Sequence, residues 1–135
     1  MTKEIERPNG VALSPDEKTL YVAQSHPDQP TITAFPVKSN GTVGKGKLFY
    51  DASPHQGPGI KGNPDGLKVD AKGNIWTSGP GGILILNSKG KLLGHILTGE
   101  QTSNCAFGGA DGSILYITAD TYILRVQTKV KGLGF

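Results

Sequence analysis

Three oxygen-bearing side chains stand at the heads of similar short segments and could contact a cation. Asn9 and Asp65 each lie between a proline and a glycine, and Asn104 heads a third segment of related pattern. Amide and carboxylate oxygens are hard donors that suit calcium or magnesium, whereas zinc prefers histidine nitrogen and cysteine sulfur. Taken singly, Asn-Gly and Asp-Gly after proline are ordinary turn formers. A cation role therefore depends on whether the fold brings these positions together.

The other chemistry-bearing residues form weaker patterns. His26, His55 and His95 are far apart and lack metal-ligand spacing, and only His55, in a long Pro/Gly-rich loop, is a candidate for touching a substrate. Cys105 is the only cysteine and enters an apolar strand, which favours a buried structural thiol over a nucleophile. Residues 57–62 fit the pattern G-x-G-x-x-G, but a proline follows the first glycine and no helix follows the last, so a loop is expected rather than a dinucleotide site.

Composition excludes several kinds of partner. The 14 Lys and Arg against 11 Asp and Glu give a net charge of +3, and the basic residues are scattered, so no nucleic-acid partner is expected. No long apolar run is present, so no membrane partner is expected either. The first seven residues are charged and lack the apolar core of an export signal. The chain as written is therefore expected to be cytoplasmic, and the location stays unknown if residues precede it.

The elements that must position these residues are short strands. Apolar or alternating runs recur every 8 to 12 residues, and no helical stretch separates them, which predicts an all-β fold. Turn residues lie between the runs, so neighbouring strands should form hairpins. Eleven strands are predicted, at 11–13, 19–23, 31–37, 47–50, 67–69, 74–77, 82–86, 92–97, 105–107, 114–118 and 122–126.

The strands group into three repeats of an inner strand, a turn and a second strand. Asn9, Asp65 and Asn104 stand at the repeat starts, 56 and 39 residues apart. These intervals bracket the length of a four-stranded propeller blade. We therefore expect one partial β-propeller domain over residues 1–135, with blades starting near residues 8, 63 and 103. The third blade ends after its third strand at Val126, so its closing strand must come from elsewhere.

Three ordered motifs resemble a known family. They cover residues 7–16 with 20–22, residues 62–70 with 73–76, and residues 104–109 with 115–119. In these motifs the chain resembles the family of senescence marker protein (regucalcin), gluconolactonase and luciferin-regenerating enzyme, and the bacterial gluconolactonase branch most of all. The resemblance implies a six-bladed β-propeller, of which this chain looks like the C-terminal half, with three four-stranded blades.

The resemblance also implies a site. One divalent cation, with calcium as the expected ion, sits at the centre of the channel in that family, and the matching ligands here are Asn9 and Asp65. The cation would polarise the carbonyl of a sugar lactone, and Asp65 would act as general base, which yields an aldonic acid. Asn104, and less directly His55, are the candidates for binding the substrate. A glutamate ligand near the start of full-length members has no matching motif in this chain.

Two functions therefore remain open. The chain is either a gluconolactonase-like, metal-dependent hydrolase completed by other residues, or a truncated propeller fragment without hydrolase activity. A homodimer would join two three-bladed halves, and residues 3–6 of one copy would then close the third blade of the other. Calcium titration separates the two functions, since an assembled enzyme should bind the ion far more tightly than an isolated half.

Overall fold

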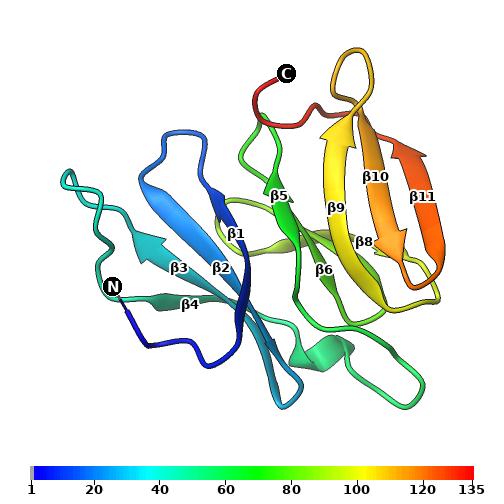
Figure 1. The fold of residues 1–135 in the computed structure, drawn as a ribbon, viewed down its shortest axis with the longest axis horizontal. Helices are drawn as coiled ribbons and strands as arrows, with labels where there is room; N and C mark the ends of the chain where they lie inside the picture. Colours follow the sequence, from blue (N-terminus) through cyan, green and yellow to red (C-terminus); the bar gives the residue numbers. More distant parts are fainter. Residues whose placement is uncertain (1) are drawn as a thin grey trace.

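The structure is a computed structural model that describes residues 2–135. The chain forms three antiparallel sheets, and each sheet is a meander in which strands that follow one another in sequence are paired. The sheets fan out around their first strands, which lie side by side in the middle of the molecule (Figure 1). This is the all-β, bladed architecture that the sequence predicted. No helix among residues 2–135 is long and apolar enough to cross a bilayer.

All eleven predicted strands are confirmed, with ends that shift by three residues at most. The first sheet contains β1 (Pro8–Leu13), β2 (Thr19–His26), β3 (Gln29–Pro36) and β4 (Lys47–Asp51). The second contains β5 (Leu67–Val69), β6 (Ile75–Gly79), β7 (Gly82–Leu86) and β8 (Leu92–Leu97). The third contains β9 (Thr102–Gly108), β10 (Ile114–Ala119) and β11 (Tyr122–Gln127), and no fourth strand pairs with it among the described residues.

The connections within each sheet are hairpin turns, and two other segments lead from the first sheet to the second and from the second to the third. Gly41, Gly73, Gly90 and Gly112 have φ angles between +73° and +79°, which the absence of a Cβ makes accessible. A single 3-10 turn, η1 (Ser53–His55), which the strand pattern did not predict, begins the loop that leads to the second sheet. The sequence signal for it is Pro54, whose fixed φ suits the first turn of a helix.

Each sheet packs face to face on the next, and two apolar clusters hold the three together. The first cluster joins Tyr21, Ala23 and Ile32 to Leu67, Val69, Ile75 and Leu86. The second joins Trp76 and Ile83 to Cys105, Leu115 and Ile117. All five residues of β6 are buried because both faces of the middle sheet are covered, whereas buried and exposed residues alternate in the central part of β10.

The inner strands approach one another unusually closely at two glycines. The backbone N–H of Gly10 donates to the carbonyl of Asp65 at 2.9 Å, and that of Gly66 donates to the carbonyl of Ser103 at 2.8 Å. A Cβ on Gly10 would overlap the Asp65 carbonyl oxygen, and a Cβ on Gly66 would overlap the Asn104 side chain. Neither glycine has a positive φ, so the Asn-Gly and Asp-Gly pairs serve close packing rather than turns.

Candidate functional site

Asp65 lies immediately before β5, and its backbone is fixed from two sides. Its N–H donates to the hydroxyl of Ser78 at 3.1 Å, and its carbonyl accepts the N–H of Gly10. The carboxylate, in contrast, accepts no hydrogen bond from the described residues. Partial burial raises the pKa of the Asp65 carboxyl above its ordinary value, because desolvation disfavours the charged form. A fixed backbone carrying an unsatisfied, partly desolvated carboxylate is typical of a binding or catalytic position.

Asn9 lies on the neighbouring inner strand, within a bulge between Pro8 and Val11. Its amide Nδ2 donates to the hydroxyl of Ser25 at 3.3 Å, and that hydroxyl donates to the carbonyl of Pro64 at 2.6 Å. This chain of bonds ties Asn9 to the residue before Asp65. The amide oxygen Oδ1 accepts no hydrogen bond from the described residues.

Asn104 is brought to the same end of the inner strands but in a different register. Asn104 pairs with Thr118 in the third sheet, as Gly66 pairs with Ser78 in the second. Asn104 is therefore the equivalent of Gly66 and not of Asp65. The expectation of strict equivalence was therefore wrong by one residue. The reason is that Asn104 directly precedes Cys105, which pairs with Ile117 as Leu67 pairs with Thr77, so the residue at the position of Asp65 is Ser103, the bulge residue of β9.

The amide oxygen of Asn104 is also already occupied. It accepts the N–H of Cys105 at 2.8 Å and lies 3.4 Å from the ammonium nitrogen of Lys68. The positive charge of Lys68 beside this oxygen repels a metal ion. Asn104 is therefore better suited to contact a neutral or anionic group than to ligate a metal ion directly. Lys68 had no role in the sequence-based prediction, because only the approach of β5 to β9, which belong to different sheets, brings it to this position.

His55 lies apart from these three residues. Its Nε2 lies 2.6 Å from the hydroxyl of Tyr50, and its ring stands edge-on to that of His95, with centroids 5.4 Å apart. Tyr50 and His95 belong to β4 and β8, the outermost strands of their sheets. No hydrogen bond links His55 to Asn9, Asp65 or Asn104 among the described residues, so its contact with substrate stays a prediction.

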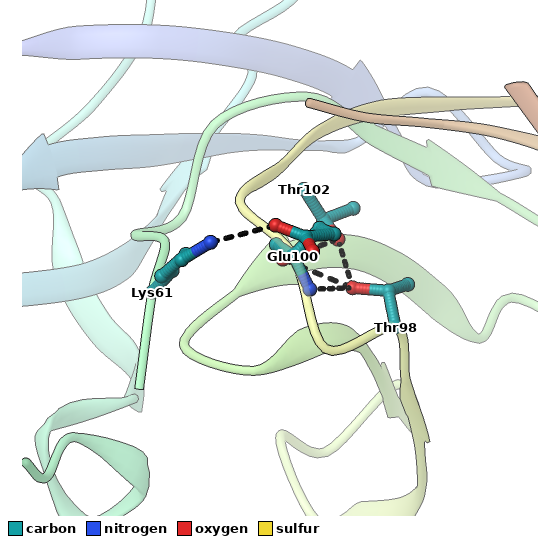
Figure 2. A network of polar contacts seen from close by, with 4 residues as sticks. All are labelled: Lys61, Thr98, Glu100 and Thr102. Atoms are coloured by element: carbon teal, nitrogen blue, oxygen red, sulfur yellow. Dashed lines mark hydrogen bonds and ion pairs between the residues drawn. The ribbon is translucent and has the colours of Figure 1, made fainter. Parts of the chain in front are cut away.

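The loop that precedes Asp65 is held in place by its neighbours. The carbonyl of Lys61 accepts the N–H of Gly81 at 2.8 Å, and its ammonium contacts the Glu100 carboxylate at 2.7 Å. Figure 2 shows the hydroxyls of Thr98 and Thr102 meeting at the backbone of Glu100, with 2.7 Å between their oxygens. The glycine-rich segment 57–62 is thus a loop, as the sequence predicted, and the contacts of Lys61 attach it to its neighbours.

Three further polar or reactive residues have structural roles, and for Cys105 this confirms the sequence-based prediction of a buried thiol. Cys105 is buried, and burial raises the pKa of its thiol to about 11, so it stays protonated at neutral pH and is a poor nucleophile. Trp76 is in the core and donates its indole N–H to Asp70 at 3.0 Å. The Asp70 carboxylate also accepts the N–H groups of Lys72 and Asn74, which makes it a turn residue.

Taken together, the donors fit part of a hard-cation site. Asn9 and Asp65 offer free oxygens on adjacent inner strands, and calcium takes six to eight oxygen ligands. No cluster of three or more His, Cys, Asp or Glu residues with metal-binding geometry occurs within residues 2–135. Two serines missed by the sequence reading, Ser25 and Ser78, fix the backbone of this site. Nothing in their local sequence distinguishes them from ordinary strand serines.

Comparison with known proteins places this arrangement in a family. The chain matches the SMP-30/gluconolactonase/LRE-like region over residues 1–121. It is 40% identical over 131 residues to a gluconolactonase of Zymomonas mobilis, an alignment that covers 95% of this chain and 36% of that protein. A solved gluconolactonase from Xanthomonas campestris is 38% identical with a TM-score of 0.76, over 91% of this chain and 38% of that one.

A calcium-binding regucalcin from Agrobacterium tumefaciens is 26% identical with a TM-score of 0.73, over 98% of this chain and 48% of that one. The chain thus spans between about a third and a half of the length of these relatives. The match confirms both the resemblance seen in the motifs and the part-propeller architecture. The chain belongs to the SMP-30/gluconolactonase/LRE family.

Proposed function

We propose that this chain carries part of the active site of a sugar lactonase that depends on a divalent cation, with calcium as the expected ion. Asn9 and Asp65 would bind the cation, and Asp65 would also act as general base. The family membership and the two free oxygens on adjacent strands support this assignment. The observation that carries it is the Asp65 carboxylate, which is partly buried yet has no hydrogen-bond partner among the described residues.

The chemistry follows from the donor types. A bound divalent cation polarises a lactone carbonyl and acidifies water. A carboxylate has two oxygens, so Asp65 can ligate through one and accept a proton from water through the other. Asn104 and Lys68, whose polar atoms lie 3.4 Å apart, would hydrogen-bond the hydroxyl groups of the sugar ring. Opening of the ring ester by water would release an aldonic acid.

Hydrolysis of glucono-1,5-lactone tests the proposal. The purified chain should accelerate hydrolysis above the spontaneous rate when calcium is present, and a chelator should remove the acceleration. Asp65→Asn keeps the shape of the side chain but removes the base, so it should lower the rate by roughly 100-fold or more. Asp111→Asn is the matched control, because Asp111 is exposed and bonds only to Ser113. Equal rates for both variants would contradict the assignment of Asp65.

A second function remains, in which the chain is a propeller fragment without hydrolase activity. Two observations favour it: the chain spans 36% of the Zymomonas relative, and the described residues contain no complete acidic or histidine metal cluster. This alternative predicts no hydrolysis above the spontaneous rate at any calcium concentration, together with a normally folded chain.

A further inference from the structure

The last sheet exposes a face that is buried in the other two. The strand ladders make Ile32, Ile83 and Ile123 equivalent, since each pairs with the corresponding residue of the second strand of its sheet. Ile32 and Ile83 are 0% exposed because the next sheet covers them, whereas Ile123 is 81% exposed. In the third sheet an isoleucine therefore lies exposed at a position that is buried in the other two sheets.

The aromatic positions of the same face repeat this pattern. Tyr21, Trp76 and Tyr116 occupy one position in the three sheets, opposite Ala12, Lys68 and Ala106. Tyr21 and Trp76 are 4% and 7% exposed, and Tyr116 is 39% exposed. Beside Tyr116 and Ile123 lies an open, mostly apolar hollow of about 240 Å³ that reaches Asn104. We call the face of Tyr116 and Ile123 the donor face of the third sheet.

The first sheet exposes the opposite half of the same contact. Val11, Leu67 and Cys105 are equivalent, because they pair with Val22, Thr77 and Ile117 of the second strands. Leu67 and Cys105 are 0% and 4% exposed because the preceding sheet covers them, whereas Val11 is 60% exposed and Leu13 beside it 38%. We call this the acceptor face of the first sheet. Residues 2–6 lie next to it, with Glu4 bonded to Gly46 and Glu6 to Gln24.

Repeat faces that are exposed to water are usually polar, and both outer faces of the described residues are apolar. The donor face packs on an acceptor face twice within the chain, so the two exposed faces are complementary by construction. The chain also covers 48% of the solved regucalcin and 42% of another solved relative, so two copies contain about as many residues as one relative. These observations point to a second copy as the occupant.

We infer that two copies of this chain associate head to tail, the donor face of each covering the acceptor face of the other, to close a ring of six sheets. A two-fold axis makes both contacts at once, so the assembly is finite. Asn9 and Asp65 of both copies would then line one channel and supply twice as many oxygen ligands. This last consequence rests on the proposed function, whereas the association itself does not.

Sedimentation equilibrium of the full chain tests the association directly. We expect a particle of twice the 14.2 kDa chain mass. Val11→Asp and Ile123→Lys each place a charge in both contacts of the ring, so each variant should sediment as a single chain. Both side chains are largely exposed in the single chain, so neither variant should impair folding, which thermal unfolding checks. Leu93→Asp is the control, because Leu93 is exposed on β8 of the middle sheet and should leave the dimer intact.

Mixing the two variants gives the sharper result. A ring of one Val11→Asp chain and one Ile123→Lys chain has one unaltered contact and one contact where Asp faces Lys, so an equimolar mixture should recover the dimer. A dimer held together by two donor faces or by two acceptor faces would not be restored by mixing the two variants. The inference would be overturned if the wild type sediments as single chains at every concentration, which is the result expected if another polypeptide covers these faces. It would also be overturned if both variants form the same dimer as the wild type. The mass is measured without calcium or lactone, so this outcome is independent of the lactonase assay.

Discussion

At the scale of single residues, the Asp65 carboxylate is the clearest functional feature. Its backbone is bonded on both sides, yet its charged group has no partner and is partly desolvated. Such a group weakens the folded state at neutral pH, where the carboxylate is ionised, because ionisation is easier in the unfolded chain. Proteins retain residues of this kind for function rather than stability.

Asp65→Asn should therefore leave the metal-free chain no less stable than the wild type. The substitution removes the desolvated charge and keeps the volume of the side chain. Chemical denaturation at neutral pH should give an unfolding free energy equal to that of the wild type or higher by up to about 1 kcal/mol. A loss of more than about 1 kcal/mol would show that the carboxylate has a structural partner in solution.

His95 predicts a pH dependence of stability. Its Nε2 is buried without a hydrogen-bond partner among the described residues, and desolvation, followed by the nearby His55, lowers its pKa below the ordinary 6.5. When the pH falls below about 6.5, the unfolded chain takes up this proton first, so the unfolding free energy should decrease. Tyr50 and His55 are the other titratable groups at this cluster.

His95→Gln should flatten that decrease, because glutamine does not titrate. Denaturation curves of wild type and variant between about pH 7 and pH 5 provide the measurement. The same decrease in both proteins would assign the pH dependence to another group.

At the scale of elements, the contact between inner strands sets the geometry of the site. Gly10→Ala would force a Cβ into the Asp65 carbonyl and separate β1 from the start of β5. We expect a loss of roughly 2–3 kcal/mol in unfolding free energy, because backbone cannot give way as a side chain can. Gly57→Ala is the matched control, since its nearest neighbour would be a side-chain atom of Ile60 at 3.7 Å. Equal stabilities of the two variants would mean that the strands are not packed this closely.

The strands were predictable because alternation, turn residues and the threefold repeat all report on local backbone. Three features were not. Asn104 takes the position of Gly66 rather than that of Asp65, and the sequence Ser103-Asn104-Cys105 carries no signal for this register. Glu17 takes a φ of +56° where four other hairpin turns use glycine, and the Asp16 carboxylate holds that turn through Ser14 and Lys18. The polar partners of the site depend on contacts between sheets, which local pattern does not encode.

At the scale of the whole molecule, the chain is a partial ring with two unlike apolar ends. Both faces of the middle sheet are covered by the neighbouring sheets. The first sheet leaves its acceptor face exposed, and the third sheet leaves its donor face exposed. The same incompleteness applies to the site, where Asn9 and Asp65 offer fewer oxygen ligands than the six to eight that calcium takes. Cation binding should therefore be tighter in the dimer than in the single chain, because the second copy would add oxygen ligands.

Calcium titration by isothermal calorimetry tests the central claim most directly. The wild type and the Asp111→Asn control should release or absorb heat with a single saturable transition, and Asp65→Asn should lose it. That result would place a cation on the free carboxylate beside Asn9. Binding that is unchanged in Asp65→Asn, or the absence of binding in the wild type, would contradict the account.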